Sequence, residues 1–348
     1  MKKRKVLWVL IFILAVAIAA AAVVTMVQQG KKPAGIEQLI ASGPIVYVEC
    51  KNIERNLNDF LNSELVRRLS AIDFLKALRQ LGAPEQEIVF YQGMLDQLRS
   101  ENNRKIFFTL FGQQVAVAAY RSESSAGKNV PLLEQAGSLA VVTRLKPEAQ
   151  FIEALTAMLA KASPQLSERV VDYKNHQIHL LSLQGGLFEL GYVKLGDFLV
   201  LGLGQKAAAT AVDVWSGERE GLAQDPLLVQ LQQRTLPGAD KRAFFRYADF
   251  MAGIKESLTA SLAKKGSTDA ATLARIEESF RYAEGFTAFF FSGVYATPMH
   301  ARVEVPFDIQ KIPDDVKGIY AQGPGQNRSA AFVPSDAVLY SWSTMMGL

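Results

Sequence analysis

An uncharged apolar stretch near the N-terminus constrains this chain more than any other feature. Residues 6–27 read VLWVLIFILAVAIAAAAVVTMV and include no charged side chain. As an α-helix, which rises about 1.5 Å per residue, this stretch would be about 33 Å long and would match the hydrocarbon core of a bilayer. The sequence therefore predicts a transmembrane helix at residues 6–27, with the lipid bilayer as its partner.

The charges on either side of this stretch predict its orientation. Cations occupy residues 2–5 directly before it, whereas only Lys31 and Lys32 follow it closely. The more basic flank of a transmembrane helix stays in the cytoplasm. We therefore expect a cytoplasmic basic tail at residues 1–5, a single-pass signal anchor in the cytoplasmic (inner) membrane, and an extracytoplasmic body exposed to the periplasm.

A cleaved signal peptide is the alternative interpretation of the same stretch. Ala20 and Ala22 offer a small-residue cleavage site. However, the apolar run continues to Val27, beyond that site, and it is longer than the usual apolar core of a signal peptide, which is about 7–15 residues. These features favour an uncleaved anchor, and the body is exported under either interpretation.

The charge balance argues against a nucleic-acid partner. The chain has 38 Lys and Arg against 34 Asp and Glu, and the basic tail at residues 2–5 accounts for the whole excess. Proteins that bind nucleic acid need a basic surface that displaces counterions from phosphates. Because the body is neutral, we expect no nucleic-acid binding.

The single cysteine, Cys50, excludes an intramolecular disulfide, even in an oxidising compartment. It lies in the apolar run at residues 45–50, so we interpret it as a small buried hydrophobic residue. A nucleophile or an intermolecular disulfide is the alternative. The body must therefore fold by burying apolar surface alone.

Apolar periodicity predicts a mixture of strands and helices in the body. Strands are expected at residues 44–50, 106–120 (in two halves interrupted at Gly112), 138–145, 170–173, 176–183, 187–193, 197–203, 243–247, 285–296 and 299–307. Helices are expected at residues 54–81, 85–101, 147–161, 206–215, 225–234, 249–264 and 269–284. These elements do not form regular βαβ units. They indicate an α+β fold, with a large antiparallel sheet and helices packed against it.

Turn residues predict how several of these strands pair. Lys174-Asn175 and Leu195-Gly196 each separate two β-like runs and are typical of hairpin turns. The last hairpin joins residues 285–296 to residues 299–307. In its second arm apolar and polar residues alternate, which predicts a half-buried strand.

The domain organisation follows from these elements. Residues 28–43 are expected to be a linker, residues 44–310 an extracytoplasmic α+β domain, and residues 311–348 a second linker with the candidate start of a truncated repeat. The repeat hypothesis depends on residues 333–342, VPSDAVLYSW, which echo the opening of the body around Tyr47. The alternative is that this segment completes the first sheet.

Several phrases of the body resemble a known family. They are SGPIVYVE at residues 42–49, LFGQQVAVAAY at 110–120, AVVTRLKP at 140–147, YVKLGDFLVL at 192–201 and VPSDAVLYSW at 333–342. The chain resembles the family named domain of unknown function 3352, whose members are exported and singly anchored. The resemblance implies an uncharacterised envelope protein, and it assigns no functional residues.

The segment Gly202-Leu203-Gly204-Gln205-Lys206-Ala207 matches the pattern G-x-G-x-x-A between a strand and a helix. A dinucleotide site also needs a following strand that ends in an acidic residue about 20 positions later. Here the next segments are helical. We therefore interpret the pattern as a tight strand-to-helix turn and expect no cofactor.

The three histidines do not form a metal site in this interpretation. His176 and His179 lie on an expected strand, where a spacing of three places them on opposite faces. His300 is expected on the solvated face of its strand. We therefore predict no metal ligands.

Other motifs have structural explanations. Ser261 and Lys264, like Ser125 and Lys128, match the S-x-x-K spacing without its companion motifs. The carboxylate pairs Glu277-Glu278 and Asp314-Asp315 and the aromatic run Phe289-Phe290-Phe291 are interpreted as solvated surface and as a buried strand, respectively. We predict no catalytic residues.

The leading hypothesis is therefore a non-enzymatic, membrane-anchored binding or scaffolding protein of the bacterial cell envelope. Its partner is expected to be an envelope protein or an apolar ligand. One alternative is a carrier or sensor of a lipid, because helices could cover a Phe-rich sheet and leave a crevice. A second alternative is an exported hydrolase, which requires Ser, His and an acidic residue to converge.

Overall fold

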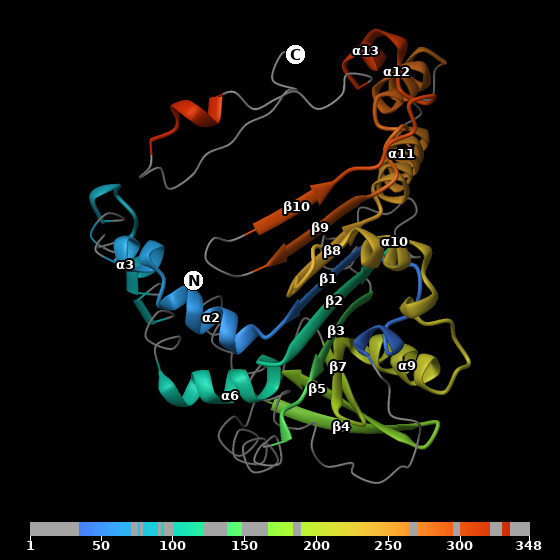
Figure 1. Ribbon diagram of the computed structural model, residues 1–348. Helices are drawn as coiled ribbons and strands as arrows, with labels where there is room; N and C mark the ends of the chain where they lie inside the picture. Colours follow the sequence, from blue (N-terminus) through green and yellow to red (C-terminus); the bar gives the residue numbers. More distant parts are fainter. Residues whose placement is uncertain are drawn as a thin grey trace. The chain divides into compact units, whose positions relative to one another are not determined.

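The computed structural model in Figure 1 describes most of the body of the chain. The described residues are 35–70, 76, 79–80, 81–89, 92–93, 100–121, 138–147, 166–183, 189–264, 270–294, 300–320 and 329–334. No helix within these ranges is long and apolar enough to span a bilayer. The transmembrane helix predicted at residues 6–27 and the repeat predicted around residues 333–342 lie wholly or mainly outside the described residues.

The chain divides into two compact units. The first unit is formed by Met1–Ser125, Asn129–Phe245 and Phe290–Val303, and the second by Ala126–Lys128, Arg246–Phe289 and Glu304–Leu348. The first unit carries nearly all of the sheet. Among the described residues, the second carries the helices that follow Phe245.

Ten strands form one sheet in the order β10-β9-β8-β1-β2-β3-β7-β6-β5-β4 (Figure 1). Their bounds are β1 Val46–Lys51, β2 Gln114–Tyr120, β3 Ser138–Arg144, β4 Leu166–Tyr173, β5 His176–Leu183, β6 Glu189–Leu195, β7 Phe198–Leu203, β8 Lys241–Phe245, β9 Phe289–Val294 and β10 His300–Glu304. Every neighbouring pair in the part of the sheet ordered β8-β1-β2-β3-β7-β6-β5-β4 is antiparallel. The predicted α+β class, with a large antiparallel sheet, is confirmed.

One row of residues crosses seven strands on a single face of the sheet. Its centre consists of small residues, and its ends are large: Leu180, Gly191, Gly202, Ala140, Ala118, Tyr47 and Phe244, each opposite the next. Successive side chains of a strand point to opposite faces. The row therefore forms a shallow trough on this face, between apolar walls.

Helix α9 (Gly204–Trp215) lies in this trough. A Cβ atom on Gly202 would be 2.1 Å from the Cβ of Ala207, and a Cβ on Gly191 would be 2.1 Å from the carbonyl oxygen of Gly204. Gly204 itself begins the helix with φ +62°, a conformation that glycine adopts easily. The G-x-G-x-x-A pattern is thus a tight strand-to-helix turn, as predicted.

Helices lie on both faces of the sheet. On the face of the trough, α10 (Pro226–Arg234) packs against β8, and the 3-10 turns η1 (Ile36–Gln38) and η3 (Leu222–Gln224) contact each other. On the other face, the Thr143 hydroxyl donates a hydrogen bond to the Leu110 carbonyl of α6 (Glu101–Phe111). Helix α2 (Ile53–Leu61) packs on α6.

The folded body begins earlier than the sequence suggested. Ile36, Leu39, Ile40 and Ala41 are at most 1% exposed, although they fall in the segment interpreted as a linker over residues 28–43. The sequence did not reveal this burial because η1 is too short to show the periodicity of a helix in its apolar residues.

One strand prediction and one helix prediction needed correction. The first half of the strand expected at residues 106–120 is the end of α6, while the second half is β2. Phe107 contacts both Phe108 and Phe111, with ring centroids 5.7 and 5.2 Å apart, so the aromatic run packs as a helix. A short apolar run does not by itself distinguish a buried helix from a strand.

The helix expected at residues 54–81 is interrupted. Helix α2 ends at Leu61, and α3 (Glu64–Ser70) begins after a break. Ser63 accepts a hydrogen bond from the amide of Val66 at 3.3 Å, which is how a serine starts a helix. The apolar spacing continues through the break, which explains why periodicity missed it.

The hairpin predictions are confirmed, with one exception in burial. Lys174 and Asn175 have φ values of +49° and +62°, as required by the tight turn between β4 and β5. At the other end of the sheet, however, β10 is exposed along almost its whole length, and Val303 is 65% exposed. The prediction of a half-buried strand was wrong because β10 is an edge strand.

The second unit is helical. It contains α11 (Tyr247–Lys264), α12 (Ala270–Arg281), α13 (Asp314–Tyr320) and η4 (Ser329–Phe332). Phe286 is central to an aromatic cluster, with ring centroids 6.0 Å from Tyr247 and 6.3 Å from Phe307. Ion pairs join Lys255 to Glu277 and Arg281 to Asp315. The carboxylate pairs are therefore surface ion-pair partners.

Replacing Gly202 by Ala tests the packing of α9. The added methyl group would meet Ala207 and the Leu139 carbonyl at 2.1 and 2.7 Å, so the helix must move. We expect Gly202→Ala to lower the free energy of unfolding by about 1–3 kcal/mol, measured by chemical denaturation in detergent.

Gly318→Ala is the matched control. Gly318 lies in α13, and a Cβ there meets nothing within 4 Å. This change should be neutral or stabilising by up to about 1 kcal/mol. If Gly202→Ala and Gly318→Ala changed the free energy of unfolding equally, the packing of α9 would not depend on its close contact with Gly202.

Candidate functional site

A pocket at the start of α9 is the candidate functional site. It has a volume of about 210 Å³ and lies within the first unit. Three parts of the chain form its walls: the segment after η1, the end of β2 with Ala140 of the adjacent strand β3, and α9 with the loop after it. The lining residues are Leu39, Ile40, Ala41, Ser42, Gly43, Tyr120, Arg121, Ala140, Lys206, Ala207, Thr210, Ala211 and Arg219.

The lining is cationic on one side and apolar on the other. Arg121, Lys206 and Arg219 each reach it, and none of the residues that form the wall in the described structure carries a carboxylate. Each of these cations is exposed, whereas Ala140 and Ala211 are buried at the base. Positive side chains therefore outnumber carboxylates among the residues that line the pocket.

Asp225 holds one wall of the pocket in place. Its carboxylate accepts hydrogen bonds from the Ser42 hydroxyl (3.1 Å) and the Gly43 amide (2.9 Å). It also accepts one from the Leu227 amide (2.9 Å) and so caps α10. One buried carboxylate therefore joins the first folded segment of the chain to a helix that begins almost two hundred residues later.

Backbone contacts complete this attachment. The Leu222 amide donates to the Ile40 carbonyl at 2.7 Å, and the Ser42 amide donates to the Glu220 carbonyl at 3.1 Å. The Tyr120 hydroxyl donates to the Ala41 carbonyl at 2.8 Å. Burial raises the pKa of Tyr120, so this phenol remains a neutral hydrogen-bond donor in the wall. The polar groups of the wall are thus used to build it.

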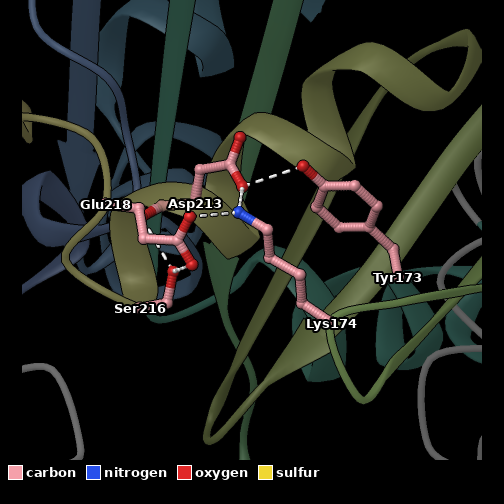
Figure 2. Close-up of polar contacts among 5 residues, drawn as sticks. All are labelled: Tyr173, Lys174, Asp213, Ser216 and Glu218. Carbon is pink, nitrogen blue, oxygen red and sulfur yellow. Dashed lines mark hydrogen bonds and ion pairs between the residues drawn. The ribbon is translucent and has the colours of Figure 1, made fainter.

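The loop that carries Arg219 is fixed by a polar cluster at the end of α9. Figure 2 shows Lys174 between the carboxylates of Asp213 and Glu218, with its Nζ 2.6 Å from an oxygen of each. The Tyr173 hydroxyl donates to Asp213 at 2.9 Å. The Asp213 carbonyl accepts the amide of Arg219 at 3.2 Å. The tip of the β4–β5 hairpin therefore supports the position of Arg219.

The charges of this cluster are mutually stabilised. Burial alone would raise the pKa of Asp213, but hydrogen bonds from Lys174 and Tyr173 outweigh it and lower the pKa. The hydrogen bond to Asp213 and the one to Glu218 raise the pKa of Lys174. Both pKa shifts favour the ionised forms of Asp213 and Lys174, so these two charges stabilise each other.

A second charged cluster lies inside the sheet. Glu49 is fully buried on the same face as the trough and forms an ion pair with Arg242 on the neighbouring strand β8. It also accepts hydrogen bonds from the Tyr47 hydroxyl (2.8 Å) and the Gln114 side chain (2.7 Å). Burial acts to raise the pKa of Glu49, but the charge and hydrogen bond of Arg242 and the hydrogen bond of Tyr47 lower it. The net pKa is below the usual range. The contacts of Glu49 make it a structural residue.

The histidines are separated from one another. The His179 Nδ1 atom lies 2.7 Å from a Glu168 oxygen, the Tyr192 hydroxyl donates to the same oxygen at 2.9 Å, and the two rings stack 4.7 Å apart. His179 was considered as a metal ligand and as the histidine of a hydrolase, but its carboxylate partner, Glu168, was not identified. His176 points to the other face of β5, and His300 is exposed on β10.

This pairing supplies two of the three members of a hydrolase triad. Ser167 and Ser182 lie on the same two strands, β4 and β5, but on the opposite face, where their hydroxyl oxygens are 2.8 Å apart. In the described part of the chain, no three His, Cys, Asp or Glu side chains gather as a metal site would require. The described contacts therefore use His179, Glu168 and Tyr192 to link β4, β5 and β6.

The remaining sequence candidates have separate positions. Ser261 lies in α11 of the second unit, and Ser125 and Lys128 fall outside the described residues. Phe290 is buried, whereas Phe289 and Phe291 are partly exposed. Cys50 is half-buried, and burial raises the pKa of its thiol, which keeps it protonated and a weak nucleophile.

Sequence reasoning missed the pocket because its cations come from distant segments. Arg121 follows a strand, Lys206 belongs to the G-x-G-x-x-A pattern, and Arg219 follows a helix. One weak signal was present: Lys206 lies in the first turn of a helix, where cations are unfavourable.

Comparisons with known proteins bring little further information. No protein family matches the sequence, so the resemblance to domain of unknown function 3352 stays a prediction. No curated protein is similar to it. Two solved structures, crystal forms III and I of TP0453, are 8% identical with a TM-score of 0.38. They cover 83% and 84% of this chain and 86% of theirs. This likeness is too distant to indicate a shared function.

Glu49→Gln tests the buried ion pair. The substitution leaves the Arg242 charge inside the sheet without its counterion. We therefore expect the free energy of unfolding to fall by about 3 kcal/mol near pH 7. Because folding lowers the pKa of Glu49, the ionised carboxylate stabilises the fold above the unfolded pKa of about 4.3. This stabilisation disappears as the pH falls through the lower pKa of the folded state.

The measurement is denaturant unfolding of both proteins between pH 7 and pH 3. The difference in the free energy of unfolding between the unmodified protein and Glu49→Gln should become smaller as the pH falls. Replacing both Glu49 and Arg242 by Leu should lower the free energy of unfolding less than Glu49→Gln does, because no unpaired charge remains. A difference that is constant with pH would contradict the assignment.

Asp213→Ala tests the cluster of Figure 2. It removes the acceptor for Tyr173 and Lys174, so the β4–β5 turn and the Arg219 loop should exchange their amide hydrogens faster with solvent. Arg169→Ala removes only an exposed ion pair with Glu189 on the same sheet and is the control. Unchanged exchange in the Arg219 loop would show that the cluster does not support it.

Proposed function

We propose that this chain is a membrane-anchored, extracytoplasmic binding protein of the bacterial cell envelope. The anchor at residues 6–27 would hold it in the cytoplasmic membrane, with the body in the periplasm. In this proposal the pocket at the start of α9 binds a small anionic group, and the protein carries out no chemical reaction. A partner protein of the envelope would recognise other surfaces of the body.

The cationic pocket is the observation that carries this proposal. Three positive side chains meet a wall whose polar groups already serve to hold the chain together. The Ser42 hydroxyl donates to Asp225, and the Tyr120 hydroxyl donates to a carbonyl, so neither is arranged as a nucleophile. This arrangement supports recognition of a charge more than its chemical conversion.

The alternative functions receive less support. A lipid carrier needs a cavity that encloses acyl chains, and ligand pockets are commonly about 300–1,000 Å³. The volume of about 210 Å³ is small for that purpose. An exported hydrolase would use the pair of His179 and Glu168, but Ser167 and Ser182 of the same strands lie on the opposite face and bond to each other. We therefore favour binding over transport or hydrolysis.

Reporter fusions test the location of the body. Alkaline phosphatase fused after Leu348 should be active, because this enzyme needs export to form its disulfides. A fusion of the same enzyme to a chain that lacks residues 1–27 should be inactive. Activity that requires the cytosol would contradict the proposal.

Photo-crosslinking in intact cells tests the binding role. A photoreactive residue in place of Thr210, which lines the pocket, should capture a small anionic molecule. The same residue in place of Asp172, exposed on β4, is the control and should not. If the purified chain converts the captured molecule to a product, and Lys206→Gln prevents this, the protein is an enzyme and the non-enzymatic proposal fails.

A further inference from the structure

The two edges of the sheet carry different charge patterns. The sheet ends in β4 at one side and in β10 at the other, and each of these strands has a single described neighbour (Figure 1). Each also carries an exposed valine: Val170 is 47% exposed on β4, and Val303 is 65% exposed on β10. An edge strand with exposed apolar residues is able to pair with a strand of another molecule. The charges beside each valine decide whether a second copy of the same chain fits there.

On β4 the charges oppose pairing with a second copy. In an antiparallel pair centred on Val170, each Glu168 would lie directly opposite the Asp172 of the other copy, because both are two positions from the centre. Like charges directly opposite each other destabilise a sheet. Charged side chains commonly protect edge strands in this way. We therefore interpret β4 as a protected edge.

On β10 the charges favour such a pairing. In an antiparallel pair centred on Val303, each Arg302 would lie directly opposite the Glu304 of the other copy. The dimer thus contains two cross-strand pairs of opposite charge, which stabilise a sheet. A pair centred on Arg302 would instead place the two arginines opposite each other. The order of charges along β10 therefore selects one register of self-pairing.

These charges select the register and are not the main source of attraction. Arg302 and Glu304 each have contacts within their own chain, and one of them is a hydrogen bond from Arg302 to the Arg234 carbonyl at 3.4 Å. The attraction comes from the backbone and from apolar surface. A second strand forms backbone hydrogen bonds along the edge of the sheet, and it covers the exposed side chain of Val303.

Val303 also extends an apolar strip of the sheet. Arg302 reaches the last residue of α10, which lies on the face of the trough, so the neighbouring Val303 points to the other face. Phe290 points to the face of the trough, because the Arg234 guanidinium lies 5.5 Å from its ring centroid. Phe291, which is partly exposed, therefore shares the other face with Val303. Pairing of two copies would join their strips into one continuous apolar surface.

We propose that β10 is a homodimerisation edge, at which two copies of this chain join their sheets by antiparallel pairing centred on Val303. A contact made by one short strand is smaller than a standard protein interface, so we expect a weak dimer in solution. Anchoring both copies in one membrane would raise their effective concentration and favour the pairing. This inference goes beyond the binding function proposed above and does not depend on the ligand of the pocket.

The test is disulfide trapping of the full chain in vesicles of phosphatidylcholine. In a Cys50→Ser background, Val303→Cys introduces the single thiol. Residues directly opposite each other in an antiparallel pair have Cα atoms about 4.5–5.5 Å apart, a distance that suits a disulfide. Mild oxidation should therefore give a covalent dimer on a non-reducing gel, and reduction should return the monomer.

Two other cysteine variants in the same background are the matched controls. Val170→Cys places the thiol at the exposed valine of the protected edge, and we expect no dimer. Ala301→Cys lies on β10 itself, but in the proposed register the two Ala301 positions are about 13 Å apart along the strands. This variant should also remain monomeric, because a disulfide needs Cα atoms within about 7 Å of each other.

Charge exchange tests the register. Added to Val303→Cys, Arg302→Glu places two carboxylates opposite each other in both cross-strand pairs, so trapping should fall about 10-fold. Further addition of Glu304→Arg recreates opposite charges in the reverse order and should restore trapping. Circular dichroism of each variant establishes that it is folded.

Three results would overturn the inference. They are absence of a dimer from Val303→Cys, equal trapping of Val303→Cys and Val170→Cys, and trapping that Arg302→Glu leaves unchanged or that Glu304→Arg fails to restore. In intact cells, a disulfide from Val303→Cys to a different protein in place of a second copy would also overturn it, because the edge would then bind a strand of another partner.

Discussion

The close contact between α9 and the glycines of the sheet is the interaction on which the rest of the structure depends. Gly191 and Gly202 lie side by side on adjacent strands, and each is too close to α9 for any side chain to fit. This contact determines the distance between the helix and the sheet. The same face of α9 provides Ala207 and Ala211 to the base of the pocket, so the dimensions of the pocket follow from the glycines.

The pocket then depends on polar contacts between segments that are distant in sequence. Asp225 binds Ser42 and Gly43, and the cluster around Lys174 and Asp213 holds the loop of Arg219. Charge-assisted hydrogen bonds of this kind are stronger and more directional than neutral ones. They fix the first folded segment and a surface loop against a rigid helix, which is the arrangement that a preformed binding site requires. The buried pair of Glu49 and Arg242 has a similar role within the sheet, where it joins β1 to β8.

Sequence patterns predicted the fold class and most of its strands, because alternation and turn residues act locally. The turn at Lys174-Asn175 and the strand-to-helix turn at Gly204 could be identified from residue types alone. Prediction failed where a local pattern fits two structures: the aromatic run before Gly112 is helical, and the apolar spacing after residue 54 conceals a break at Ser63. It also failed for β10, because alternation does not reveal whether a strand lies at an edge.

By itself, the sequence determined the hydrophobic segment at residues 6–27, the neutral charge of the body and the α+β class, since each depends on composition or on short-range periodicity. Only the tertiary structure decided that residues 36–43 belong to the folded body and that Arg121, Lys206 and Arg219 share a pocket. The physical reason is that these residues come together through strand register and through hydrogen bonds such as the one between Ser42 and Asp225. Contacts over such separations leave no period in the chain.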